Sequence, residues 1–241
     1  MRLVQICIIL VLTSICGNLH ADDSTTVEIR QVGARTWIHT SYEIVNGYRT
    51  DSNGLVVGCS AGMILVDTCW NDTQTHALRQ RIEDLFHKPI ILAIITHAHS
   101  DRIGGIRELV AAGIKVVSTA VTAKYAVNAG YPAPTKELDL SITDLQLGDI
   151  EVETFYPGPG HTKDNIVVWI PMERVLFGGC LVKAMSSNNL GNIADADIQA
   201  WGPSAKNLKE RYPLAMFVIP GHGQVGGIEL LQHTIDLCLK K

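Results

Sequence analysis

The stretch PIILAIITHAHSDRIGG, residues 89–105, decides the fold of this chain. Its first eight residues form an unbroken apolar run, which predicts a buried strand. His97, His99 and Asp101 follow at alternating positions, so we expect their side chains on one side of an extended segment. The glycine pair at 104–105 predicts a tight turn into a helix. Polar groups just past the C-terminal end of a buried strand are typical of a ligand site in layered α/β folds.

The flanking segments indicate how this strand is covered. Before it, short β-branched segments separated by Gly, Asn and Ser predict an antiparallel meander: residues 27–32, 36–42, 54–59 and 63–68. Leu78, Ile82 and Leu85 then lie at helical spacing and predict a helix over 73–86. After it we expect helices at 103–112, 122–128, 197–211 and 227–239, and strands at 115–118, 150–156, 165–170, 174–179 and 215–220. These elements predict an α/β fold, a four-layer αββα sandwich with two mixed sheets between outer helices.

The composition points to one globular domain that acts on small molecules. The chain has 241 residues, of which 46% are hydrophobic, and this supplies enough apolar side chains for a single core. Its net charge is -4 and its Lys and Arg residues form no patch, which argues against nucleic acid as a partner. We expect a monomer.

The first residues have the pattern of a secretory signal. Met1 and Arg2 precede an apolar run over 3–15, and small and polar residues follow. We therefore expect a signal peptide over residues 1–21, cleavage near Ala21, and one domain over 22–241 in the periplasm or secreted. A membrane anchor is the alternative, but the run is shorter than the roughly 18 to 20 residues that a span needs, so we expect no stable span in the mature form. Lipid attachment at Cys16 is a further alternative, with a poor fit to the preceding residues.

Three more potential metal ligands lie in Gly-rich contexts at strand ends. They are His161 in YPGPGHT, Cys180 in FGGC and His222 in IPGHG. Glycine lets the backbone bend closely around an ion, and nitrogen, oxygen and sulfur donors together suit zinc. Taken alone, Cys180 would be interpreted as a buried thiol or half of a disulfide. Cys59 and Cys69 lie across a short hairpin turn in a register that is out of disulfide reach.

The motifs HAHSDR, GHT, GGC and GHG, in this order and at these separations, resemble those of the metallo-β-lactamases. The resemblance covers nearly all of the mature chain. It extends to the broad-spectrum two-zinc subclass, in which cysteine is the fifth ligand. Glyoxalase II-like and nuclease-like relatives typically have HxHxDH and a bridging aspartate, and this chain has Arg102 and Cys180 in those places.

The resemblance implies two Zn²⁺ ions and a role for several neighbouring residues. One zinc would be held by His97, His99 and His161, and the other by Asp101, Cys180 and His222. Lys183 would bind the substrate carboxylate, Trp70 would form a pocket wall, Asn192 would bind substrate and donate to the oxyanion, and Asp101 would join Asn192 as a catalytic residue. Arg102 and Asp67 would support the ligands from behind, and residues 42–54, with Tyr48, would form a mobile hairpin over the substrate. Each of these neighbours also has an ordinary structural interpretation: a surface lysine, a core tryptophan, a turn asparagine or a strand-end aspartate.

The resulting hypothesis is zinc-dependent hydrolysis of the β-lactam amide of penicillins, cephalosporins and carbapenems, which would confer antibiotic resistance. Zinc lowers the pKa of bound water to about 7, which provides a nucleophile without a serine. Two rivals remain open: a related hydrolase of lactones or thioesters, and a non-catalytic periplasmic zinc-binding protein. Cys180 and Lys183 argue against the first, and an open metal position would argue against the second.

Overall fold

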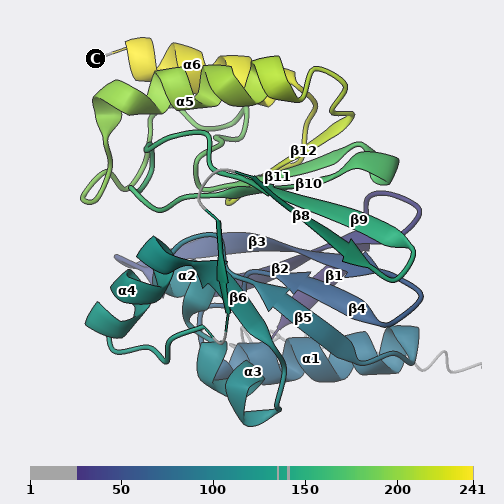
Figure 1. Cartoon of the computed structure of the whole chain (residues 1–241). Coiled ribbons are helices and arrows are strands. Elements are labelled where there is room, and N and C mark those ends of the chain that lie inside the picture. The colour runs from purple at the N-terminus through teal and green to yellow at the C-terminus, as the bar shows by residue number, and fades with distance from the viewer. Residues whose placement is uncertain (1–25, 135, 140–141, 241) are drawn as a thin grey trace, which may run out of the picture.

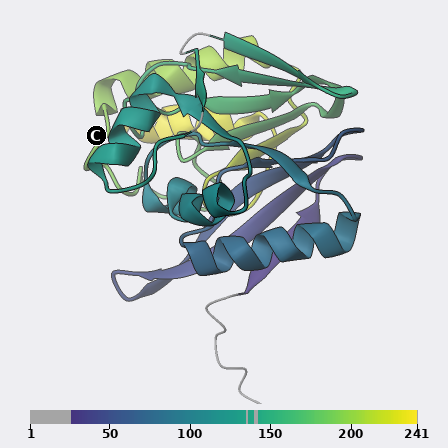
Figure 2. The same ribbon diagram turned by 60° about the horizontal axis from the view of Figure 1, so that its bottom comes forward.

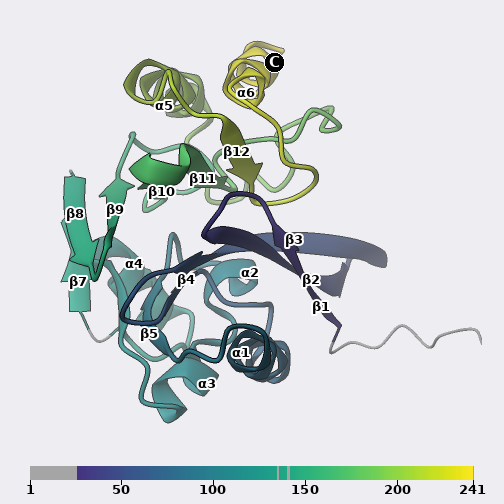
Figure 3. The ribbon, with the colours of Figure 1, turned by 90° about the vertical axis from the view of Figure 1, so that its right-hand side faces the viewer.

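The computed structural model describes residues 26–134, 136–139 and 142–240. Two sheets lie face to face, with helices α1 and α3 on one outer side and α5 and α6 on the other (Figure 1, Figure 3). This is the predicted four-layer αββα sandwich, and the prediction is confirmed. The predicted signal peptide, 1–21, lies outside the described residues.

The larger sheet begins as the predicted antiparallel meander and continues as a parallel sheet. Within the described residues its seven strands follow chain order: β1 (Val27–Gln31), β2 (Thr36–Val45), β3 (Tyr48–Gly58), β4 (Met63–Val66), β5 (Ile90–Ile94), β6 (Val116–Thr119) and β7 (Lys136–Leu138). The apolar run of the deciding stretch becomes β5, between β4 and β6. Its central position explains why an uninterrupted apolar sequence is required there.

The smaller sheet is built from the C-terminal half and is also mixed. Its five strands within the described residues lie in the order β12 (Phe217–Pro220), β11 (Val175–Gly179), β10 (Val167–Ile170), β9 (Ile150–Phe155) and β8 (Ile142–Leu147). Only β11 and β12 pair in parallel. Their C-terminal ends therefore lie at the same edge, where Cys180 and His222 follow.

The helices lie on the outer faces of the two sheets or in the connections between strands. They are α1 (Asp72–Phe86), α2 (Ser100–Ile103), α3 (Ile106–Ala111), α4 (Ala120–Asn128), the short 3₁₀ helix η1 (Pro171–Glu173), α5 (Ile198–Arg211) and α6 (Glu229–Leu239). The Asn71 side chain accepts a hydrogen bond from the Gln74 backbone N–H and so fixes the start of α1. None of the helices in the described part of the chain has the length and apolarity that crossing a membrane requires.

The main core fills the space between the sheets. Leu55, Ile94 and Val66 from the larger sheet are fully buried in the same cluster as Val168 and Phe177 from the smaller one. Cys59 and Cys69 are free and buried, as their predicted register requires. The two halves of the chain thus share one apolar interior.

Three local expectations were wrong. The strands β7 and β8 were not predicted, although Ile142–Leu147 alternates between exposed and half-buried positions. The predicted helix 103–112 is shorter than expected: α3 covers Ile106–Ala111, the chain turns at 104–105, and Ile103 ends the preceding helix α2. Asp101 does not lie on an extended segment but in the first turn of α2.

The glycine pair between α2 and α3 is explained by packing rather than by special backbone angles. A Cβ on Gly104 would lie 2.0 Å from the carbonyl oxygen of Trp70, and one on Gly105 would lie 1.8 Å from Thr75 Oγ1. Any larger residue would push α2 away from the segment that precedes α1. Asp101 and Arg102 depend on this close approach for their positions.

The predicted substrate-covering segment is the long hairpin formed by β2 and β3. Val45 pairs with Tyr48 across a two-residue turn, in which Asn46 and Gly47 have φ of 53° and 81°. Such positive angles match the right-handed twist of the flanking strands. The hairpin stands out from the body of the molecule (Figure 2). Ile44 and Tyr48 near its tip are 58% and 77% exposed, so the tip presents large hydrophobic side chains to solvent.

Candidate metal centre

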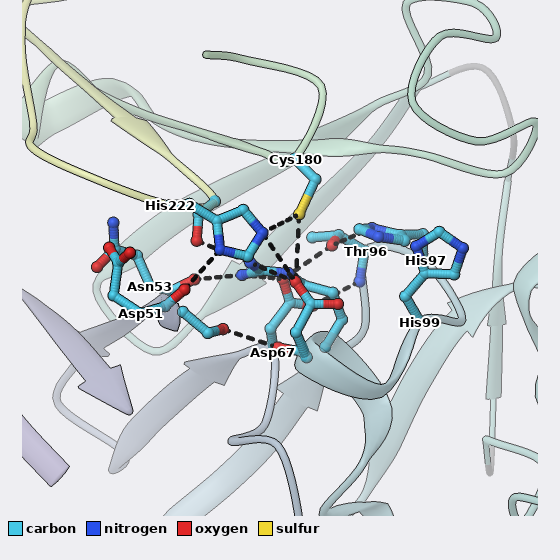
Figure 4. Close-up of polar contacts among 12 residues, drawn as sticks. Asp51, Asn53, Asp67, Thr96, His97, His99, Cys180 and His222 are labelled. Atoms are coloured by element: carbon cyan, nitrogen blue, oxygen red, sulfur yellow. Dashed lines mark hydrogen bonds and ion pairs between the residues drawn. The ribbon is translucent and has the colours of Figure 1, made fainter. Parts of the chain in front are cut away.

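The six predicted metal ligands come together at one end of the two sheets. His97, His99 and Asp101 follow β5, whereas Cys180 follows β11 and His222 follows β12. His161 lies in the loop between β9 and β10. Figure 4 shows Cys180 and His222 pointing toward each other, with His97 and His99 to one side. The cluster therefore joins segments that are far apart in the sequence.

The first group consists of three imidazoles that converge on a small volume. The Nδ1 atom of His99 lies 3.1 Å from Nε2 of His161. One ligand atom from each of His97, His99 and His161 lies within 4.8 Å of the others. His97 Nε2 is buried without a hydrogen-bond partner. A buried lone pair without a donor is costly in a finished protein, and a metal ion would remove that cost.

Burial keeps two of these imidazoles, His97 and His161, neutral. It lowers the pKa of His161 to about 3, with a further contribution from His99. It also lowers the pKa of His97 well below its usual value, and His161 adds to that effect. Neutral imidazole is the form that binds zinc. This group thus fits a three-histidine zinc site.

The second group consists of one carboxylate, one sulfur and one imidazole at nearly equal separations. Cys180 Sγ lies 3.4 Å from Asp101 Oδ2 and 3.4 Å from His222 Nε2, and these last two atoms are 3.3 Å apart. Ligands about 2.0 to 2.3 Å from a tetrahedral zinc would be separated by about 3.3 to 3.5 Å. His97 also lies within reach of Asp101 and Cys180, so the two groups adjoin.

The charges of the second group favour a cation. Burial alone would lower the pKa of His222, yet Cys180 and Asp101 raise it to about 10. Its Nδ1 lies 2.5 Å from the carbonyl oxygen of Asp51, which accepts a hydrogen bond and directs Nε2 toward the other two side chains. A Cβ on Gly221 would lie 2.6 Å from Cys180 Sγ, so the glycine before His222 lets the two segments meet.

Arg102 lies directly behind the second group and is fully buried. Its Nε and Nη2 atoms donate to Asp101 Oδ2 at 3.0 and 2.8 Å, and its guanidinium also donates to the carbonyl oxygens of Asn53 and Gly221. Burial would raise the pKa of Asp101, but Arg102 and His222 hold it well below its usual range. Arg102 therefore contacts Asp101, and its role in supporting the metal ligands stays a prediction. Its contacts with the backbone of β3 could not be read from a motif.

Asp67 supports the first group through a residue that the sequence did not reveal. Thr96 donates to Asp67 twice, from its backbone nitrogen and from Oγ1, both at 2.8 Å. Because the hydroxyl proton is used there, Thr96 Oγ1 accepts from His97 Nδ1, at 3.3 Å, and His97 Nε2 is left as the ligand atom. Asp67 itself is buried with φ of 61°, and burial raises its pKa to about 7 against the opposing charge of Arg102.

Asn53 and Asp51 are two further site residues that no motif singled out. The Asn53 side chain donates to the carbonyl oxygens of Pro220 and Gly223, and Asp51 Oδ2 accepts from the Gly223 backbone at 2.5 Å. These contacts fasten the loop of His222 to β3. The signal in the sequence was the polar run TDSNG. The structure places it within β3, where Asp51 is half-buried and Asn53 is buried.

Lys183 and Trp70 lie beside the cluster. Lys183 is 9% exposed, with its Nζ 5.9 Å from the centre of the Trp201 ring, and burial lowers its pKa. A Cβ on Gly191 would lie 3.3 Å from that Nζ, which places Lys183 against the following loop. Trp70 is half-buried, and its ring centre is 6.4 Å from that of His222. Both side chains therefore border the second group.

Asn192 is exposed, and its Oδ1 accepts a hydrogen bond from the Ala194 backbone at 3.1 Å. Its role as an oxyanion donor stays a prediction. Next to this loop, a cavity of about 580 Å³ borders the first group and is lined by His99, Tyr125, Lys163, Asp195 and neighbouring residues. A small organic molecule has room to lie against His99.

Comparisons with known proteins agree with this geometry. The family model described as "Metallo-beta-lactamase superfamily" matches residues 48–222. The "Metallo-beta-lactamase type 2" of Bacillus cereus is 48% identical over 216 residues, which cover 90% of this chain and 84% of that protein.

Solved structures give the same result. A metallo-β-lactamase from Pontibacter korlensis has a TM-score of 0.87 and 36% identity, covering 90% of this chain and 100% of its own. FIM-1 from Pseudomonas aeruginosa, in a mono-zinc form, has a TM-score of 0.84 and 36% identity, covering 89% and 95%. The fold, the two groups of converging ligands and these relatives together show that the chain belongs to the metallo-β-lactamase superfamily.

Proposed function

We propose that this chain is a zinc-dependent hydrolase that opens the β-lactam amide of penicillins, cephalosporins and carbapenems, and so confers antibiotic resistance. The observation that carries the proposal is the pair of adjoining ligand groups, one of three converging imidazoles and one of Asp101, Cys180 and His222. The relatives are metallo-β-lactamases, and this supports the substrate class. One relative, FIM-1, has been solved in a mono-zinc form, and this supports zinc as the metal.

Two zinc ions would be held by the two ligand groups. His97, His99 and His161 would hold the first, and Asp101 with Cys180 and His222 the second. Zinc, when bound, polarises a carbonyl group and makes water a stronger nucleophile at neutral pH. Arg102 keeps the carboxylate of Asp101 ionised and oriented, and Thr96 keeps the lone pair of His97 Nε2 available.

The residues around the ligands would select and orient the substrate. Lys183 is a largely buried cation next to the second group, where it would pair with the carboxylate that these antibiotics share. Asn192 lies on the adjoining loop and would donate to the developing oxyanion, with Asp101 as the second catalytic residue. Trp70 would form one wall. The exposed apolar tip of the β2–β3 hairpin, with Tyr48, would cover the bound molecule.

We also propose that residues 22–241 form a single domain that acts as a monomer, in the periplasm or secreted, after removal of residues 1–21. The charged start and short apolar run of the sequence support export.

Hydrolysis assays with controlled metal content test the function. The purified, zinc-loaded chain should open nitrocefin and a carbapenem, lose this activity with a chelator and regain it with added zinc. Full activity after removal of the metal would contradict the metal mechanism. A zinc-loaded chain that is inert toward every β-lactam but cleaves lactones or thioesters would favour the related-hydrolase alternative.

The role of Cys180 needs a separate experiment. Cys180→Ser removes the sulfur but keeps the size of the side chain, so activity should require a higher zinc concentration than in the wild type. Cys59→Ser is a matched control, because Cys59 is a buried thiol outside the site. An unchanged zinc requirement in Cys180→Ser would show that the second site is wrongly assigned.

A further inference from the structure

The outer nitrogen of His99 faces a carboxylate. His99 Nε2 lies 3.0 Å from Asp195 Oδ2, while Nδ1 on the other side of the ring faces His161. A neutral imidazole carries one proton, and a carboxylate at Nε2 holds that proton there. The lone pair of Nδ1 is then directed toward the ligand atoms of His97 and His161.

His99 differs in this respect from the other site imidazoles that the structure describes. The outer nitrogen of His97 faces the Thr96 hydroxyl, that of His222 faces the Asp51 carbonyl, and that of His161 has no hydrogen-bond partner. Only His99 has a carboxylate there. A carboxylate hydrogen bond makes a ligand imidazole more basic as well as better oriented.

Asp195 is presented by a loop that has its own internal order. In the 189–197 loop, the Asn189 and Asn192 side chains each accept a backbone hydrogen bond two residues ahead, at 2.9 and 3.1 Å. The end of the loop is fixed by Asp197, which donates its N–H to the Gly160 carbonyl at 2.9 Å and caps α5 by accepting from Ala200. Gly160 immediately precedes His161. Asp195 therefore lies two residues from an anchor next to another ligand of the same group.

We propose that Asp195 is a positioning residue of the first metal site, which fixes the tautomer of His99 and ties the 189–197 loop to the metal centre. This inference rests on the zinc binding proposed above. Because linkage is reciprocal, metal in the first site orders the loop, and an ordered loop strengthens the first site. Asn192 lies on the same loop, so the loop that borders the substrate is held in place by the ligand shell.

Zinc affinity tests the proposal without relying on catalysis. Competition with a chromophoric chelator measures both sites in wild type, Asp195→Asn, Asp195→Ala and the control Asp84→Asn, which removes an exposed carboxylate on α1. Loss of a carboxylate behind a ligand imidazole typically weakens metal binding by about 10- to 100-fold. Asp195 is 67% exposed, so we expect about 10-fold for Asp195→Ala at the first site, less for Asp195→Asn, which keeps an acceptor, and no change for Asp84→Asn.

Cobalt substitution separates the two sites. The sulfur-to-cobalt charge-transfer absorption requires Cys180 and therefore reports the second site, which should titrate as in the wild type. Amide hydrogen exchange over 189–197 should slow with zinc in the wild type and respond less in Asp195→Ala.

The results distinguish this inference from the proposed function. Unchanged first-site affinity in Asp195→Ala, or equal weakening at both sites, would overturn the role of Asp195 and leave the proposed function intact. A wild-type chain that binds no zinc would overturn both.

Discussion

Arg102→Met is expected to be among the most destabilising single substitutions in this protein. The change keeps much of the length of the side chain but removes a fully buried positive charge. Asp101 then loses two hydrogen bonds, of 3.0 and 2.8 Å, and the carbonyl oxygens of Asn53 and Gly221 lose their guanidinium donor. Asp67, 3.6 Å from Arg102, loses a compensating charge as well. Removing one partner of a buried ion pair costs about 3–5 kcal/mol, a large part of the roughly 5–15 kcal/mol that stabilises a typical domain.

Urea denaturation of the metal-free protein measures this cost without interference from zinc. With a slope of about 3 kcal/mol per molar urea, the midpoint should fall by about 1–2 M. Arg81→Met is the matched control, because Arg81 is exposed on α1, and its midpoint should change little. In an Asp67→Asn background, Arg102→Met should cost less, since one of the two stranded carboxylates has been neutralised.

The reasoning would be refuted by a loss below about 1 kcal/mol, since that is the range of an exposed ion pair. Equal costs of Arg102→Met in the wild-type and Asp67→Asn backgrounds would show that Arg102 does not act on Asp67 through charge.

Three other perturbations follow from the same contacts. Lys183→Met should raise KM by about 10- to 100-fold, because it removes a charged hydrogen bond worth about 1.5–3 kcal/mol. Steady-state kinetics measures this change, and a substrate whose carboxylate is esterified should show no such rise in KM. Burial lowers the pKa of His39 from 6.5 to about 4, so below pH 6.5 the unfolded chain gains a proton that the folded chain does not. The free energy of unfolding should therefore fall by up to about 3 kcal/mol between pH 6.5 and 4. In urea titrations over that range, His39→Gln should lose less stability than the wild type. An equal loss in both proteins would argue against a role of His39 in the pH dependence. Gly54→Ala would place a Cβ 2.0 Å from His39 Nε2 and 2.6 Å from the Val66 carbonyl oxygen. Thermal unfolding should therefore show a loss of about 1–3 kcal/mol in the free energy of unfolding. An unaltered Tm would mean that β2 and β4 move apart without cost.

Much of the fold could be predicted from the sequence because the local patterns agree with the tertiary structure. The apolar run before His97 became a central strand, and the helical spacing of Leu78 and Ile82 became the buried face of α1. The strand β7 was missed because it has only three residues, and β8 was missed because none of its positions is fully buried, so its alternation in the sequence is weak. Such strands owe their existence to pairing partners that are distant in sequence.

The candidate site was predictable where chemistry is concentrated in single residues. All six predicted ligands come together in the structure. They could be recognised because His and Cys are rare residues, and because His161, Cys180 and His222 stand next to glycines. The family resemblance is confirmed by the relatives, and the αββα architecture by the structure.

The residues that hold the ligands were harder to find. Thr96, Asp51 and Asp195 act through hydrogen bonds between segments whose proximity only the folded chain defines. Threonine and aspartate are too common in loops and strands to stand out without that proximity. The extended geometry predicted for Asp101 failed for a related reason, since the packing of Gly104 against Trp70 bends the chain into a helix directly after His99.

Each ligand group draws on both sheets: His97, His99 and Asp101 come from the N-terminal half, and the other three ligands from the C-terminal half. Any ion held there is a cross-link that closes a loop of 60 residues or more, which the unfolded chain could close only at a large entropic cost. Metal binding should thus stabilise the association of the two halves of the protein. Release of the metal would remove this cross-link, and the two halves would then keep their shared core and the hydrogen bonds that Asn53 and Arg102 make to the segment around His222.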